Sequence, residues 1–130
     1  MKQTFKKEER LHSKKLIGEL FAGGNTFFVY PFKVIYKEID EKKEFPVQVL
    51  ISVSKRKFKS AVKRNKVKRL FREAYRKNKS IVFNRSSHSD KTLLIGFIYV
   101  ADTILDYHEI EKKIMIILQR LKSNDEKADS

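Results

Sequence analysis

The apolar segment Thr92–Val100 is the feature that most restricts how this chain can fold. Nearly all of its residues are apolar, and a short run of this kind is typical of a central β-strand that is buried on both faces. A strand buried on both faces needs a packed layer on each side of its sheet. We therefore expect helices to pack against the sheet that contains this strand.

The first part of the chain predicts one helix followed by β-strands. Ser13–Ala22 is amphipathic, with Ser13 as the N-cap, and Gly23-Gly24 is expected to end this helix by supplying a left-handed residue. Thr26–Glu38 and Val47–Val53 are rich in β-branched and aromatic residues, and a proline interrupts the first of them. We interpret these two segments as two or three strands.

Two further helices are predicted in the rest of the chain. In Ala61–Lys79, apolar residues recur on one side of a helix at about 100° per residue, and basic residues occupy the opposite side. Asp106 and Glu109 resemble a capping box, and they precede an apolar stripe that ends at Leu121. A polar loop over 84–91 leads from the second helix to the buried strand.

These elements predict a single α+β domain over residues 1–122, with helices packed on a mixed sheet of about four strands. The expected order of elements is α-β-β-β-α-β-α. Residues 123–130 are mostly polar, and we predict that they form a disordered tail.

The absence of cysteine and of long apolar segments limits the class of protein. Without cysteine, the chain has no disulfides, no thiolate nucleophile and no cysteine-ligated metal site, which fits a reducing compartment. No apolar region follows the first residues as in a signal peptide, and the run Leu93–Ala101 is far shorter than the ~20 residues that span a bilayer. We therefore expect a soluble, cytoplasmic protein with no membrane partner.

The charge of the chain is concentrated in one segment. The whole sequence has 30 Lys and Arg against 16 Asp and Glu, a formal net charge of +14. Lys55–Lys79 holds 13 of these basic residues and a single acid, Glu73, so that the other residues together are almost neutral. So large an excess of positive charge repels itself unless a polyanion is bound nearby.

A run of basic residues is commonly no more than a solvated face. Here the helical spacing collects the charges opposite an apolar stripe, which favours a surface that contacts nucleic-acid phosphates. Asn65, in the middle of the basic face, adds a group that forms hydrogen bonds. The residues predicted to bind RNA are Lys55, Arg56, Lys59, Lys63, Arg64, Asn65, Lys66, Lys68, Arg69 and Arg72.

The same segment carries a long motif. Ser52-Val53-Ser54-Lys55, followed by Ala61–Tyr75 with the sequence AVKRNKVKRLFREAY, resembles the signature of the bacterial ribonuclease P protein subunit. The resemblance extends over roughly residues 8–121 in the order of elements, beginning at Arg10-Leu11. The family's usual Arg-Asn-Arg reads Arg64-Asn65-Lys66 here, and lysine keeps the charge but lacks the planar fork of a bidentate phosphate contact.

The resemblance implies that a catalytic RNA, the ribonuclease P RNA, cleaves the 5′ leader from precursor tRNA. The protein would bind this RNA and the leader and would lower the magnesium requirement. Mg²⁺ would be held through the RNA, so no cofactor is expected on the protein side chains alone. The resemblance also implies a left-handed β-α-β crossover through the basic helix, which the periodicity does not indicate.

The resemblance further implies a cleft for the leader between the first helix and a face of the sheet. The matching positions are Phe21 on the helix and Phe32 and Tyr36 on a strand, and Ile17 stands where the family commonly has an aromatic residue. Unpaired bases gain ~1 to 3 kcal/mol each by stacking on such rings. The alternative is that these aromatics belong to the hydrophobic core.

No catalytic or metal site is recognisable in the sequence. Hydrolysis of a phosphodiester needs clustered carboxylates that hold metal ions, or a paired acid and base. Glu73 has arginines at its helical neighbour positions and is expected to form an ion pair with one of them. His12, His88 and His108 lie in unrelated contexts, and each is expected to be a surface or boundary residue rather than a general base. The four glycines form no phosphate-binding loop. We predict that the protein itself carries no catalytic residue and binds no metal.

Two other functions stay open at this point. A ribosomal protein or general RNA chaperone would share the charge but not the Arg64-Asn65 motif. A metal-dependent nuclease would assemble its site from acids that are distant in the chain. The sequence does not indicate whether the free protein dimerises, which RNA helices it contacts or which leader it prefers.

Overall fold

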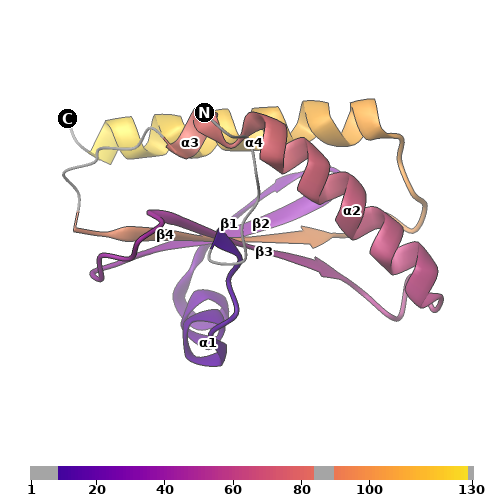
Figure 1. Cartoon of the computed structure of the whole chain (residues 1–130), viewed down its shortest axis with the longest axis horizontal. Helices are drawn as coiled ribbons and strands as arrows, with labels where there is room; N and C mark the ends of the chain where they lie inside the picture. Colours follow the sequence, from indigo (N-terminus) through magenta and orange to yellow (C-terminus); the bar gives the residue numbers. More distant parts are fainter. Residues whose placement is uncertain (1–8, 84–89, 129–130) are drawn as a thin grey trace.

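A four-stranded sheet lies between two helical layers in this protein (Figure 1). The computed structural model describes residues 9–83 and 90–128, so most of the predicted loop 84–91 lies outside the described residues. The elements are α1 Lys14–Gly23, β1 Asn25–Val29, β2 Phe32–Ile39, β3 Val47–Val53, α2 Ala61–Asn78, α3 Ser80–Phe83, β4 Thr92–Tyr99 and α4 Tyr107–Ala128. This order confirms the predicted one, with the short helix α3 added.

The sheet is mixed, as predicted. Its strand order is β1-β2-β4-β3; β1 and β2 are antiparallel, β2 and β4 are antiparallel, and β3 and β4 are parallel. Parallel neighbours need a crossover connection, and here the chain passes through α2 and α3 on one side of the sheet (Figure 1). The left hand of this crossover stays a prediction from the resemblance.

The strand that was predicted to be central, β4, is buried on both faces. Ile95 and Phe97 belong to the core cluster that includes residues of α2 and α4, whereas Leu94 belongs to the smaller cluster that includes residues of α1. In Figure 1, α2, α3 and α4 lie on one side of the sheet and α1 lies on the other. Because side chains alternate between two covered faces, the sequence of β4 has almost no polar position.

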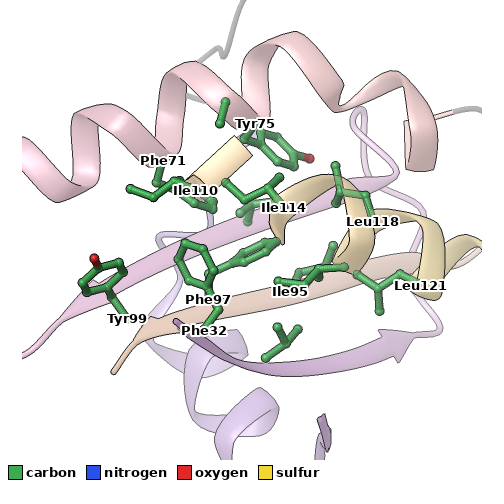
Figure 2. Close-up of a cluster of buried hydrophobic side chains, with 14 of the residues drawn as sticks. Phe32, Phe71, Tyr75, Ile95, Phe97, Tyr99, Ile110, Ile114, Leu118 and Leu121 are labelled. Atoms are coloured by element: carbon green, nitrogen blue, oxygen red, sulfur yellow. The ribbon is translucent and has the colours of Figure 1, made fainter. Parts of the chain in front are cut away.

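The larger core fills the space between the sheet and the layer of α2 and α4 (Figure 2). Phe32, on β2, is at its centre, with ring centroids 6.1 Å from Phe71, 5.8 Å from Phe97 and 5.6 Å from Tyr99. Helix α4 covers this aromatic group with an apolar stripe that consists of Ile110, Ile114, Ile117, Leu118 and Leu121. Burial of each such side chain contributes about 1.5 to 3 kcal/mol.

Helix α1 begins as predicted but ends differently. The hydroxyl oxygen of Ser13 accepts a hydrogen bond from the backbone N–H of Leu16 at 3.2 Å, which is the expected N-cap. The prediction of a left-handed glycine is wrong, because Gly24 has φ −76° and no described glycine has a positive φ. Gly24 is needed for close packing, since a Cβ there would lie 2.5 Å from the carbonyl oxygen of Leu20 and 2.7 Å from a side-chain carbon of Ile35.

Side-chain caps also start the two long helices. Ser60 accepts from the backbone N–H of Lys63 at 3.3 Å, and the carboxylate of Asp106 accepts from the N–H of Glu109 at 2.9 Å, as the predicted capping box requires. Helix α4 continues to Ala128, so residues 123–128 are helical rather than part of a disordered tail. A helix that is already packed extends at little cost, because each added residue contributes one hydrogen bond.

The residues before α1 run along the outer edge of β3. Arg10 forms a parallel bridge with Val49, and the N–H of Leu11 donates to the carbonyl oxygen of Val49 at 2.9 Å. Glu9 is buried, and its carboxylate lies 2.7 Å from the ammonium of Lys79, just after α2. These long-range contacts, which were not predicted, hold the segment against β3 and the end of α2.

Candidate nucleic-acid interface

Helix α2 has the two sides that its sequence predicts. The buried side packs against the sheet and α4, and it consists of Val67, Phe71, Ala74 and Tyr75. The opposite side is polar and basic, and it consists of the exposed residues Asn65, Lys66 and Arg69 with the half-buried residues Arg72 and Arg76. Lys63 and Arg64 precede the buried Val67 by four and three residues, so they lie near the buried side at the start of the helix, and the half-buried Lys68 lies between the two sides. The predicted RNA-binding residues of the helix are therefore accessible, but only Asn65, Lys66, Arg69 and Arg72 share the side opposite the core.

The loop between β3 and α2 adds four exposed cations, which are Lys55, Arg56, Lys57 and Lys59. Phe58 anchors this loop, because its ring is 5% exposed and lies 6.2 Å from the ring of Tyr99. Lys57 has a different role from the other loop cations, since its ammonium donates a hydrogen bond to the backbone carbonyl of Val100. The buried ring of Phe58 and the hydrogen bond of Lys57 thus fix the position of the loop. Its remaining basic side chains are exposed to solvent.

Arg64 connects this loop to α2. One of its guanidinium nitrogens donates to the carbonyl oxygen of Phe58 at 2.6 Å and to that of Lys59 at 3.1 Å. The first residue of the Arg64-Asn65-Lys66 motif therefore positions the loop, while the second and third residues are exposed.

A groove of about 550 Å³ lies along the basic side of α2. It is lined by Arg10, Val62, Asn65, Lys66, Arg69, Arg72, Glu73 and Arg76. Cations that surround a concave surface concentrate the positive potential there, which favours an anionic ligand such as a phosphate. Four predicted RNA-binding residues meet in this groove, and the structure adds Arg10 and Arg76 to them.

Arg10 and Arg72 also line a second hollow, of about 220 Å³, which reaches Lys68 and His12 beside β3. Burial, followed by the nearby charge of Arg10, lowers the pKa of Arg72 from its ordinary value. An anion beside the two guanidiniums offsets their repulsion. The basic surface therefore extends from α2 to the segment that precedes α1.

Glu73, the acid of the basic segment, is paired within α2. Its carboxylate accepts two hydrogen bonds from Arg76, at 2.6 and 3.1 Å, and lies 3.9 Å from the ammonium of Lys77. The hydrogen bond from Arg76 lowers the pKa of Glu73, and the same bond raises the pKa of Arg76. The predicted arginine partner is confirmed.

The remaining titratable candidates that the structure describes do not gather into a metal site. Within residues 9–83 and 90–128, no group of three or more His, Asp or Glu is placed to hold a metal ion. His12 and His108 are exposed, as predicted, and His88 lies outside the described residues. Among the described helices, none has the length and apolar character needed to cross a membrane.

Phe32 does not belong to a leader cleft, contrary to the prediction. Its exposed fraction is 0%, and its ring packs edge-on against three aromatic rings of the larger core. A base cannot stack on a ring whose faces are already covered by protein. The core alternative is the correct one for this residue.

Phe21 and Tyr36 lie on opposite faces of the sheet, so the three predicted aromatics form no common cleft. Tyr36 packs against the larger core and lies 5.8 Å from the ring of Phe27, which in turn lies under Arg120 of α4. Phe21 is on α1, which packs on the other face, and it is 47% exposed. The β2 side chains in the cluster with α1 are Ile35 and Ile39. A leader contact of Phe21 stays a prediction.

A family model described as Ribonuclease P matches residues 5–122, which is most of the chain. The chain belongs to the ribonuclease P protein family. The ribonuclease P protein component of Porphyromonas gingivalis strain ATCC 33277 is 37% identical to it over 118 residues, which cover 91% of this chain and 86% of that relative. The component from strain W83 of the same species has the same identity and coverage.

Solved ribonuclease P proteins share the fold. The protein from Thermotoga maritima superposes with a TM-score of 0.67 at 23% identity, covering 86% of this chain and 96% of its own. The Staphylococcus aureus protein has a TM-score of 0.64 at 22% identity, covering 89% of this chain and 97% of its own. Their likeness confirms the single α+β domain with its four-stranded mixed sheet.

In this ribonuclease P protein, Asn65 lines the groove beside α2, whereas Arg64 holds the loop that precedes the helix. Lys66, which departs from the usual arginine, is exposed and lines the groove. Arg10 is the main groove residue that the prediction missed. The pair Arg10-Leu11 was part of the resemblance, but only its pairing with β3 brings it beside a helix that is distant in the chain.

Proposed function

We propose that this ribonuclease P protein binds the catalytic RNA of ribonuclease P and the 5′ leader of precursor tRNA, and that it thereby assists the maturation of tRNA 5′ ends. The groove along α2 is the observation that carries the proposal. It brings together cations from the motif helix and from the segment before α1, among them Arg10, Arg69 and Arg72. Phosphates of a folded RNA are a ligand that matches this charge and shape.

The distribution of positive charge along the chain supports RNA as the partner. The net charge of +14 comes almost entirely from the segment Lys55–Lys79, and most of its cations are exposed on α2 and on the loop before it. Binding of such a surface to RNA releases condensed counterions, which supplies affinity without sequence preference. Asn65 adds a directional hydrogen-bonding group in the groove.

The basic surface also accounts for the proposed effect on magnesium. Phosphates of the catalytic RNA and of its substrate repel one another when they are packed together, and either divalent cations or a basic protein surface reduces this repulsion. Mg²⁺ would act through the RNA in this arrangement. We expect the protein to lower the magnesium concentration at which the RNA cleaves its substrate, within the cytoplasm, where we expect it to act.

We assign the hydrolysis itself to the RNA. The acid in the groove, Glu73, is held by Arg76 and Lys77, and a carboxylate paired with two cations is a poor general base. Substitution of Glu73, His12, His88 or His108, one at a time, should therefore leave the single-turnover cleavage rate of the saturated holoenzyme nearly unchanged. Loss of a general base typically costs a hundredfold or more, so a fall of that size with intact RNA binding would contradict the assignment.

Cleavage of precursor tRNA by the purified protein, with and without ribonuclease P RNA, tests the proposed function. The expected result is cleavage only with the RNA, and stimulation by the protein at low magnesium. Cleavage without the RNA would instead indicate a nuclease. Absence of any effect on the RNA reaction would indicate a ribosomal protein or a general RNA chaperone.

A further inference from the structure

Two aromatic side chains at the edge of the sheet are exposed to solvent. Phe28 at the end of β1 is 57% exposed, and Tyr30 in the turn that follows is 50% exposed. Their ring centroids lie 6.4 Å apart with an interplanar angle of 54°. Adjacent exposed rings leave apolar surface in water, and such surface commonly marks a binding site.

The register of the strands places Phe28 beside a lysine. Phe28 is paired with Lys33 across the β1–β2 hairpin, and Lys33 is paired with Ile98 of β4. Directly opposed residues point to the same face of an antiparallel pair. Because Ile98 packs with the cluster under α1, Phe28 and Lys33 lie on the α1 side of the sheet, where Lys33 is exposed.

The aromatic turn is also tied to the basic loop before α2. The carbonyl oxygen of Pro31, next to Tyr30, accepts a hydrogen bond from the N–H of Val100 at 2.8 Å. The carbonyl oxygen of the same Val100 accepts from the ammonium of Lys57 in the loop. Val100 thus joins the turn and the loop, so the two exposed rings and the exposed loop cations lie at the same end of the sheet.

We propose that Phe28, Tyr30 and Lys33 form a stacking platform for unpaired nucleotides of RNA. The rings contact the bases, and Lys33 with the cations of the neighbouring loop contacts the phosphates. The positive charge around the rings favours a polyanion with aromatic groups over an apolar protein partner. The inference rests on the proposed function and extends it, because the platform is separate from the groove along α2 and contains none of the aromatics in the predicted leader cleft.

A tryptophan reporter provides a direct test, because the chain contains no tryptophan. In the full-length Tyr30→Trp variant, a short oligouridylate should quench the tryptophan fluorescence as a base stacks on the indole. An abasic oligomer of the same length, with equal charge, should bind through its phosphates without this quenching. Phe28→Trp provides a second reporter if the first variant is unstable. Ile116→Trp is the matched control, since Ile116 is 42% exposed on α4 and lies away from the platform.

Three outcomes of the reporter experiment would overturn the platform. They are equal quenching by the two oligomers, equal quenching at position 116, and unchanged fluorescence while anisotropy shows that the oligouridylate is bound. Sedimentation gives a further check. Self-association of the wild-type protein that disappears in Phe28→Ala would show that a second copy of the chain is the occupant, and would also overturn the proposal.

The holoenzyme distinguishes the possible sources of the unpaired nucleotides. Phe28→Ala and Tyr30→Ala should each weaken binding by about five- to 150-fold if one base stacks on the ring that is removed. A loss confined to leader-bearing precursor tRNA assigns the platform to the leader, and a loss of affinity for the catalytic RNA alone assigns it to that RNA. No loss for either RNA overturns the platform, and the proposed function survives that result as long as substitutions in the α2 groove still weaken RNA binding.

Discussion

The guanidinium of Arg64 lies 2.6 Å from the carbonyl oxygen of Phe58, so a residue of the basic motif on α2 holds the loop that precedes the helix. Phe58 itself is buried against Tyr99. The two contacts connect the hydrophobic core to a charged loop. Arg64 therefore contributes to the shape of the basic surface as well as to its charge.

Arg64→Ala should lower the free energy of unfolding by about 1 to 2 kcal/mol, because two carbonyl oxygens lose a charged donor. The neighbouring substitution Asn65→Ala is the matched control and should change stability by less than ~0.5 kcal/mol, since Asn65 is exposed. Urea unfolding of both variants gives the comparison. Equal stabilities would show that the contact of Arg64 with the loop is of no energetic importance.

The double substitution Arg64→Ala with Asn65→Ala should abolish the stimulation of ribonuclease P RNA at low magnesium, because it removes a charge and a directional contact from the basic surface. The reaction of the RNA alone should be unaffected. Cleavage rates measured over a magnesium series should show that high magnesium restores the activity with the double variant. Failure of high magnesium to restore it would mean that the protein does more than reduce phosphate repulsion.

Simultaneous replacement of Lys68, Arg69 and Arg72 by alanine should reduce the slope of log affinity against log salt by about two to three, since each lost phosphate contact flattens it by ~0.7 to 0.9. Lys112, Lys113 and Lys122 of α4 provide a control triple variant with the same change in charge. Filter binding of ribonuclease P RNA at several salt concentrations measures both slopes. An unchanged slope for the α2 variant would exclude this side of the helix as the RNA footprint.

Phe32→Ala should destabilise the protein by about 3 to 5 kcal/mol, because it leaves a cavity among Phe71, Phe97 and Tyr99. Phe21→Ala should change stability by no more than ~0.5 kcal/mol, since that ring is half exposed. If Phe21 contacts the leader, its loss should weaken binding of precursor tRNA but not of mature tRNA to the holoenzyme. Thermal unfolding and the two binding assays separate packing from recognition.

Tyr107 should make the protein less stable in alkaline solution. Burial, followed by the nearby carboxylate of Glu111, raises the pKa of Tyr107 from 10.0 to about 12. The unfolded chain therefore loses this proton at a lower pH than the folded protein, and the contribution to stability is present below pH 10.0 and is lost as the pH rises to about 12. Urea unfolding across this range should show that the free energy of unfolding declines less for Tyr107→Phe than for the wild type. Equal declines for the two proteins would show that Tyr107 has the same pKa in the folded and unfolded states.

Local patterns predicted most of the fold because they report burial directly. The apolar run of β4 indicated a strand covered on both faces, and Ser13 and Asp106 marked helix starts that the structure confirms with hydrogen bonds. The end of α1 was harder to predict. Gly24 is required by its contacts with Leu20 and Ile35, and a glycine needed for close packing looks the same in a sequence as one needed for a left-handed turn.

The sequence by itself determined the order of the elements, the basic side of α2 and the family motif, because each depends on residues that are close together in the chain. Only the tertiary structure decided the role of the aromatics, since alternation along β2 shows which side chains share a face but not which face meets α1. The structure shows that Phe32 is a core residue and that Phe28 is exposed. The position of Arg10 in the groove could not be predicted for a similar reason. The pairing of its segment with β3 is a long-range contact, which no local pattern encodes.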